Sequence, residues 1–176
     1  LKLQKEFDLE VALVGSGYEY RNLHLLKKEN PFFIVPLDFS QVPFVNTTSA
    51  ALEVNLKTLK HWDQGPFNPY KLLENGNEIA ITSFGLDVKS FRKNLIKAID
   101  YGLSKKDALA ALTTVPAKKL DLDDKLGSLN KGKLAHFFIM DGDYFDIESN
   151  MLTVWIENQE YIINHRPAID IRGTWQ

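Results

Sequence analysis

Residues 127–163, GSLNKGKLAHFFIMDGDYFDIESNMLTVWIENQEYII, differ in pattern from everything before them. Three apolar or β-branched runs, at 134–140, 151–156 and 161–163, alternate here with polar turns such as Asp141-Gly142-Asp143. The pattern predicts a meander of three antiparallel strands, with hairpin turn chemistry after the first. The chain therefore changes architecture near residue 126.

Upstream, the sequence alternates between strand and helix patterns. Short apolar runs that end in glycine, proline or polar residues predict buried strands at 10–14 (EVALV), 32–35 (FFIV) and 78–82 (EIAIT). A helix is expected over residues 18–29, between the first two strands. Strand, helix and strand with short connections are typical of a parallel α/β unit.

The segment between the second and third strands is less regular. Residues 36–48 predict a loop, and Ser49 is a plausible N-cap for the helix that follows. Residues 61–69, rich in proline, glycine and asparagine, predict a second loop before a short helix at 70–74. The apolar positions of the first of these helices would be Leu52, Leu56 and Leu59.

Two better-defined helices follow the third strand. The first carries an apolar stripe and ends at Gly102, a good C′ residue. The second begins with Ser104 and Asp107 at N-cap and N3 spacing, and its apolar face stops before Pro116. The stripe of the first helix consists of Phe91, Leu95, Ala98 and Ile99.

Composition excludes several classes of protein. The chain has 176 residues, 44% of them hydrophobic and 25% charged, which is enough for a globular core. A net charge of −2 argues against nucleic acid or an acidic membrane as partner. No run approaches the roughly 20 apolar residues of a membrane helix, no signal peptide is visible, and cysteine is absent, so the cellular compartment stays open.

Three segments divide the chain. Residues 1–125 predict a partial β/α barrel, 126–167 strands of a β-sandwich subdomain, and 168–176 the start of a following segment. The chain begins as if within a helix and stops as a new strand begins, which predicts a piece of a longer polypeptide.

The motifs resemble the amidohydrolase superfamily. Residues 107–120 (DALAALTTVPAKKL) are similar to its last barrel helix, with the pattern ALxxxTxNPA, and 123–135 (DDKLGSLNKGKLA) resemble its GSLxxGKxAD signature. Residues 137–143 and 154–156 are similar to the strands that follow. The match covers 78–163, and residues 1–40 resemble the imidazolonepropionase-like branch more weakly.

The resemblance implies an α/β fold: the second part of a (β/α)8 TIM-like barrel, followed by small β-sandwich strands. It also implies a metal-dependent hydrolase that acts on C–N bonds of non-peptide amides, cyclic amides or related compounds, with one or two divalent metals, usually zinc. The implied partners are a small-molecule substrate and the N-terminal half of the same barrel, which would carry metal ligands; a homo-oligomer is possible.

Parallel α/β units place ligand chemistry at the carboxyl ends of their strands. By the resemblance, an aspartate should follow the last barrel strand, yet Phe84 occupies that position and the nearest carboxylate is Asp87. The loop Gly15-Ser16-Gly17 likewise lacks a histidine that related sequences often carry there. No metal ligand can therefore be identified, and Asp87 is a weak candidate for the catalytic carboxylate.

His61, Trp62 and Ser83 are candidates to line a substrate pocket, because polar and aromatic side chains in loops often do so. A histidine that simply packs on its tryptophan is the alternative. His24 and His165 are expected on the surface and His136 is expected to be structural, on a sandwich strand, and none has the spacing of zinc ligands.

Two other functions stay open. A degenerate amidohydrolase module without metal would act as a scaffold within a longer protein. The pair Gly15 and Gly17 before a helix is also compatible with an unrelated domain that binds phosphate or sugar.

Overall fold

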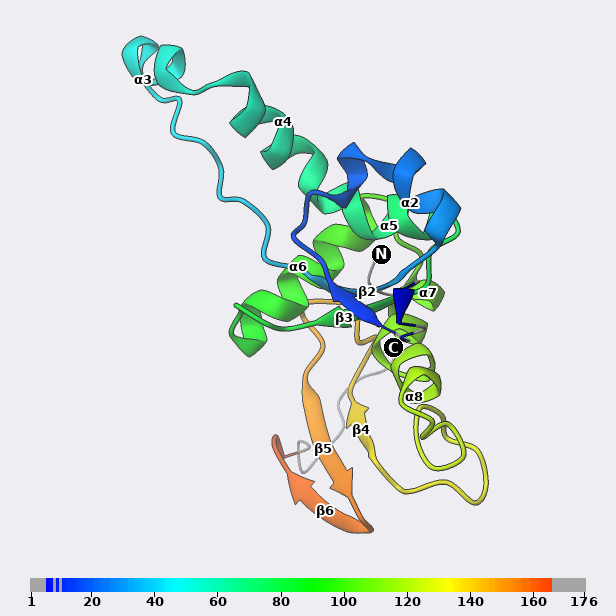
Figure 1. Cartoon of the computed structure of the whole chain (residues 1–176). Coiled ribbons are helices and arrows are strands. Elements are labelled where there is room, and N and C mark those ends of the chain that lie inside the picture. Colours follow the sequence, from blue (N-terminus) through cyan, green and yellow to red (C-terminus); the bar gives the residue numbers. More distant parts are fainter. Residues whose placement is uncertain (1–5, 8, 10, 166–176) are drawn as a thin grey trace, which may run out of the picture.

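Three parallel strands organise the larger part of the molecule. The computed structural model describes residues 6, 7, 9 and 11–165. Strands β1 (Ala12–Val14), β2 (Phe32–Pro36) and β3 (Ile79–Thr82) form one sheet in the order β1-β2-β3 (Figure 1). All three predicted strands are therefore confirmed, although Glu10, the first residue expected in β1, lies outside the described residues.

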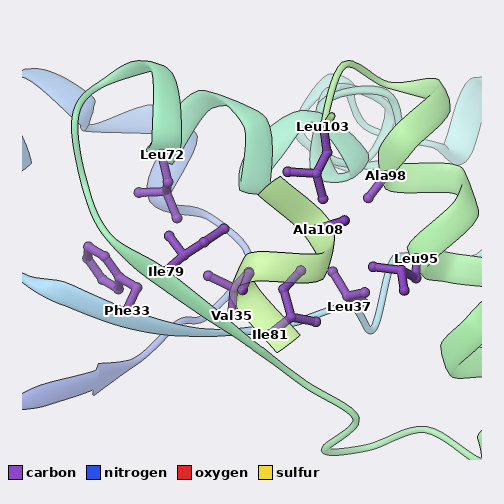
Figure 2. Close-up of a cluster of buried hydrophobic side chains, with 11 residues drawn as sticks. Phe33, Val35, Leu37, Leu72, Ile79, Ile81, Leu95, Ala98, Leu103 and Ala108 are labelled. Carbon is purple, nitrogen blue, oxygen red and sulfur yellow. The ribbon is translucent and has the colours of Figure 1, made fainter. Parts of the chain in front are cut away.

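Alternate residues of these strands point to one face, which forms the core. Phe33 pairs with Ile79, and Val35 pairs with Ile81, so their side chains share this face. All four are buried and pack with side chains from the neighbouring helices (Figure 2). The buried cluster also contains Leu37, Leu72, Leu95, Ala98, Leu103, Ala108 and Ala111.

Helices cover this face along the length of the sheet (Figure 1). They are α5 (Asn68–Glu74), α6 (Val88–Asp100) and α7 (Lys105–Leu112), and α8 (Thr114–Lys119), which follows α7, borders the opposite face. The predicted apolar stripe of α6 is confirmed, and so is the Ser104 N-cap, whose hydroxyl accepts a hydrogen bond from the Asp107 amide at 3.0 Å. The helical run was expected to end before Pro116, but this residue lies in the first turn of α8, where proline is tolerated.

The opposite face of the sheet is only partly covered. Val14, Ile34 and Ala80 lie side by side on it; Val14 is 69% exposed and Ile34 is half-buried, whereas Ala80 is 6% exposed. The face lines a depression of about 410 Å³ that α8 borders through Pro116, Lys119 and Leu120. One side of the sheet is thus packed, while the other is open at β1 and part of β2.

The connection from β2 to α5 extends away from the sheet (Figure 1). It contains α3 (Thr48–Glu53), α4 (Leu56–Gln64) and the 3-10 turn η2 (Gly65–Phe67). Three expectations for this segment are wrong. The N-cap is Thr47 instead of Ser49, Asn55 caps a second helix and so separates Leu52 from Leu56, and residues 61–69 are helical instead of a loop.

The helix expected over 18–29 is also divided. A 3-10 turn, η1 (Glu19–Arg21), precedes α2 (Leu23–Glu29). Asn22 separates the two with a non-helical backbone, and Asn30 ends α2 in the left-handed conformation at φ 38°. The break brings η1 against α5, as described below.

A second sheet follows α8. Strands β4 (Phe137–Met140), β5 (Met151–Ile156) and β6 (Gln159–Ile162) are antiparallel in the order β4-β5-β6, which confirms the predicted meander. Glu157 and Asn158 both have positive φ, as a two-residue hairpin turn requires. β4 and β5 pair through a ten-residue connection, 141–150, that begins with the predicted turn residues Asp141-Gly142-Asp143. Residues 126–165 form this one three-stranded sheet, so the β-sandwich stays a prediction.

Arg92 of α6 joins the two sheets. Its guanidinium donates to the carbonyl oxygens of Tyr144 at 2.9 Å, Ser149 at 2.7 Å and Asp146. Lys105 of α7 adds an ion pair with Asp143 at 2.5 Å. The β4–β5 connection is therefore held against α6 and α7 by several charge-assisted bonds. None of the helices in the described part of the chain is long and apolar enough to cross a membrane.

The core predicts a large difference between two leucines on neighbouring helices. Leu95→Ala removes a side chain with 0% exposure, and we expect a loss of about 2–5 kcal/mol in the free energy of unfolding because a cavity remains. Leu109→Ala, at a position that is 50% exposed, should cost about 1 kcal/mol or less. Urea unfolding of the full-length protein measures both, and equal losses would contradict the assigned core.

Candidate functional site

The loops after β2 and β3 meet at the carboxyl end of the sheet. Gly85 has φ +84°, and a Cβ atom at this position would lie 3.5 Å from the Asp38 carboxylate. The Leu86 amide donates to the Ser83 carbonyl at 2.9 Å, which closes a turn after β3. This turn holds Ser83 and Phe84 on the surface, and Phe84 is 76% exposed.

Asp87 lies at the end of that turn and is the N-cap of α6. Its Oδ1 accepts the amides of Lys89 and Ser90, at 2.9 and 3.0 Å, and its Oδ2 accepts the Ser90 hydroxyl at 2.7 Å. The bonds from Ser90 hold the pKa of Asp87 below its usual value. Both oxygens thus have helix-capping partners, and the candidacy of Asp87 as a catalytic base stays a prediction.

Glu19 closes the loop after β1. Its carboxylate accepts the Ser16 amide at 2.5 Å, the Ser16 hydroxyl at 2.8 Å and the Gly17 amide at 3.2 Å. Asn68 of α5, which is 1% exposed, donates to it at 2.7 Å and accepts the Tyr20 amide at 2.8 Å. This network fixes η1 against α5.

The same network answers the phosphate-binding alternative for Gly15 and Gly17. An anion at such a loop would bind the amides of Ser16 and Gly17, and these amides already bind the Glu19 carboxylate. Burial alone would raise the pKa of Glu19, but the hydrogen bonds from Ser16 and Asn68 outweigh it and leave the pKa below its usual value. A charged internal carboxylate therefore takes the place of a bound anion.

His61 lies in the last turn of α4, and the expectation that it sits in a loop is wrong. Its ring stacks on Tyr18, with centroids 3.7 Å apart and planes at 15°, and its Nδ1 lies 3.2 Å from the Tyr20 hydroxyl. Burial lowers the pKa of His61, and the neighbouring Arg21 charge lowers it further. His61 is therefore neutral near pH 7, and its ring packs from α4 onto Tyr18, the residue before η1.

Trp62 and Ser83 lie apart from this stack in their contacts. Trp62 is half-buried, and its indole nitrogen is shielded from solvent without a hydrogen-bond partner among the described residues. Ser83 is exposed after the carboxyl end of β3, whereas the residues that contact His61 follow β1. Their role in a substrate pocket stays a prediction, as does that of His61.

The described residues do not assemble a metal centre. No group of three or more His, Cys, Asp or Glu side chains in this part of the chain could hold a metal ion. His24 and His165 are exposed, as the sequence predicts, whereas His136, which was expected on a strand, is exposed just before β4.

Sequence reasoning missed Glu19, Asn68 and Tyr18. Glu19 carries no motif, and Asn68 lies 49 residues from it in the chain, so only the folded structure shows that they bond. The one local signal was the string of two glycines followed at once by Tyr18 and Glu19, which offers free amides next to an acceptor.

The parallel sheet with helices on one face, followed by an antiparallel sheet, defines a mixed α/β protein. The model of the amidohydrolase family matches residues 67–166, which is more than half of the chain. The chain belongs to the amidohydrolase family. A search of curated protein sequences found no match.

Solved structures show the same fold. The chain is similar to an amidohydrolase from Thermotoga maritima, with a TM-score of 0.67 and 24% identity over 94% of this chain and 39% of the other. It is also similar to a Xaa-Pro dipeptidase with bound methionine in its active site, with a TM-score of 0.64 and 17% identity over 92% and 47%. The chain thus spans less than half of the length of these proteins.

The Glu19 network predicts a pH dependence of stability. A carboxylate whose pKa is lowered on folding stabilises the native state above its unfolded pKa, near 4.5, and this contribution is lost as the pH falls through the folded value. Glu19→Gln should therefore lower the Tm at pH 7 and reduce the decline of Tm below pH 5. Thermal melts of the full-length protein from pH 3 to pH 7 test this, and parallel curves for both proteins would contradict it.

Asp87 offers a second test, because asparagine can also cap a helix. We expect Asp87→Asn to keep the Tm while Asp87→Ala lowers it. If capping is the whole role of Asp87, Asp87→Asn also keeps within a few-fold the kcat of any amide hydrolysis that the full-length protein catalyses. A loss of about a hundredfold or more at an unchanged Tm would instead assign Asp87 to proton transfer.

Proposed function

We propose that this chain forms the last three strands of a (β/α)8 barrel in a longer metal-dependent hydrolase of C–N bonds. The observation that carries the proposal is the partly uncovered face of the parallel sheet at Val14 and Ile34, which a closed barrel would turn inward. The family assignment supports it, and so does the coverage of almost all of this chain by less than half of an amidohydrolase structure.

In this proposal the preceding half of the barrel is the main partner of the chain. Residues 1–125 contribute barrel wall, 126–167 contribute strands of a β-sandwich, and 168–176 begin a following segment. The edge of β1 would pair with the preceding strand, since an open edge of a parallel sheet is a ready template for pairing. A homo-oligomer is compatible with this arrangement.

The proposed substrates are small non-peptide amides, cyclic amides or related compounds, and an imidazolonepropionase-like enzyme is the finer proposal. The family generally depends on divalent metals, and zinc is the metal we propose. The described residues of this chain do not fit a metal centre by themselves, because Asp87 is engaged as a cap and Phe84 carries no donor atom. Metal ligands would therefore come from the other barrel strands.

Within such a barrel, this chain would shape the rim of the active site. Ser83 and Phe84 at the end of β3, and Asp38 at the end of β2, lie at the carboxyl edge, where barrel enzymes bind their substrates. His61 and Trp62 on α4 are proposed to line the substrate pocket farther out. Asp87 remains the catalytic carboxylate that the sequence proposes.

A second function is favoured by one observation, the apolar and exposed Phe84 at the end of the last strand. We propose as the alternative that the module has lost its metal and serves as a scaffold within a longer protein. The two proposals differ in whether the full-length protein binds metal.

Metal analysis of the full-length protein separates them. For the hydrolase we expect about one to two equivalents of zinc by inductively coupled plasma mass spectrometry, and no gain in Phe84→Asp because the ligands lie elsewhere. Phe84→Tyr is the matched control that keeps the ring.

The opposite result would reject the hydrolase proposal for this module. A protein without metal that acquires zinc in Phe84→Asp, but not in Phe84→Tyr, would identify the scaffold and the position where its site was lost.

A further inference from the structure

A second depression lies between η1 and α4, apart from the depression on the open face of the sheet. It has a volume of about 410 Å³ and is bordered by Tyr20 and Arg21 of η1 and by one side of α4. The α4 residues that line it are Leu56, Lys57, Lys60 and Gln64. Lys57, Lys60 and Gln64 are spaced by three and four residues and so lie along one face of the helix, and Leu56, four residues before Lys60, borders that face.

The charges of this pocket are all positive. Arg21, Lys57 and Lys60 line it, and no carboxylate does. None of these three side chains forms an ion pair within the described part of the chain. Three cations around one depression create a positive potential, which is a general feature of anion-binding sites.

The arginine is held in place before any ligand arrives. Its guanidinium lies over the Tyr18 ring, 4.4 Å from the centroid, and its Nε donates to the Tyr20 hydroxyl at 3.3 Å. Tyr18 is in turn fixed by its stack on His61. An arginine oriented in this way loses little conformational freedom when it binds an anion.

The nearest carboxylates are occupied by other groups. Glu19 binds the loop after β1 and Asn68, as described above. The Asp63 carboxylate accepts a hydrogen bond from the side-chain Nε2 of Gln64 at 2.6 Å, and the side-chain Oε1 of Gln64 accepts one from Lys71 at 2.5 Å, so a fourth cation lies next to the pocket. Neither carboxylate lines the depression or neutralises its lysines.

The pocket also has an apolar wall. Leu56 is 64% exposed, and the aliphatic stems of Lys57 and Lys60 extend along the same helix face. Inorganic ions make no use of such a wall, whereas an apolar ligand body gains free energy by covering it.

We propose that the pocket between η1 and α4 binds a small organic anion, with one carboxylate or phosphate group on an apolar body. The head group would bind Arg21, Lys57 and Lys60, and the body would cover Leu56 and the Tyr20 ring. This site goes beyond the proposed hydrolase function and does not depend on it.

His61 supplies a readout that is independent of activity. The Arg21 charge contributes to the lowered pKa of His61, so an anion bound at Arg21 should raise that pKa. We would label the full-length protein with ¹³C-histidine, assign the His61 signal with His61→Gln, and follow its pH titration by NMR.

The probes are hexanoate and hexyl phosphate, with 1-hexanol as the uncharged control and inorganic phosphate as the control without an apolar body. We expect either hexyl anion to shift the His61 signal in a saturable way and to raise its pKa. The anion with the lower Kd identifies the head group. Equal binding of 1-hexanol, or of inorganic phosphate, would overturn the proposal.

Paired variants test the lysines. The double substitution Lys57→Gln and Lys60→Gln should weaken binding of the hexyl anion about tenfold or more, because two charge-assisted contacts are lost. Lys93→Gln, on an exposed position of α6 that does not line the pocket, should leave the Kd unchanged. A Kd unchanged in the double variant, or no shift of His61 with either anion, would show that the pocket is not an anion site.

Discussion

The parallel sheet is fully packed on one face only, and the rest of the molecule follows from this constraint. Phe33, Val35, Ile79 and Ile81 point to the face that the helices cover, while the other face is open at Val14 and Ile34 and buried at Ala80. Parallel sheets are stable when both faces are covered, since their strands carry apolar residues on both sides. The open part of this face is thus the physical reason for the proposal that the chain forms part of a larger barrel.

Most strands and the better helices could be predicted because their signals are local. A run such as EIAIT is too short for a helix and too apolar for a loop, and the stripe of α6 repeats with the helical period. The segment 36–64 could not be predicted in the same way. Leu52 and Leu56 have helical spacing but are 83% and 64% exposed, so their apolar character reports no burial, and the Asn55 cap divides the helix between them.

The residues of the candidate site also divide into those that the sequence could locate and those whose role only the fold reveals. Motif resemblance could locate Phe84 and Asp87 after β3, because both lie within one continuous stretch of sequence. It could not reveal that Asp87 caps α6, which depends on the backbone of residues 88–90, or that Glu19 binds Asn68. Polar groups that satisfy amides at helix ends and tight loops have the same residue types as catalytic groups, and only geometry separates them.

The crossover from β2 to α5 connects these observations. Its excursion of α3 and α4 adds nothing to the buried cluster beneath the sheet, yet it brings His61 onto Tyr18 and places two lysines opposite Arg21. Long insertions on the carboxyl side of an α/β sheet cost little stability, since loop-closure entropy grows slowly with length. Such a segment is free to acquire a binding role, because the core does not constrain its surface residues. Lys57 and Lys60 of α4 form no ion pair among the described residues, which is why we assign them to the proposed anion site instead of to the stability of the fold.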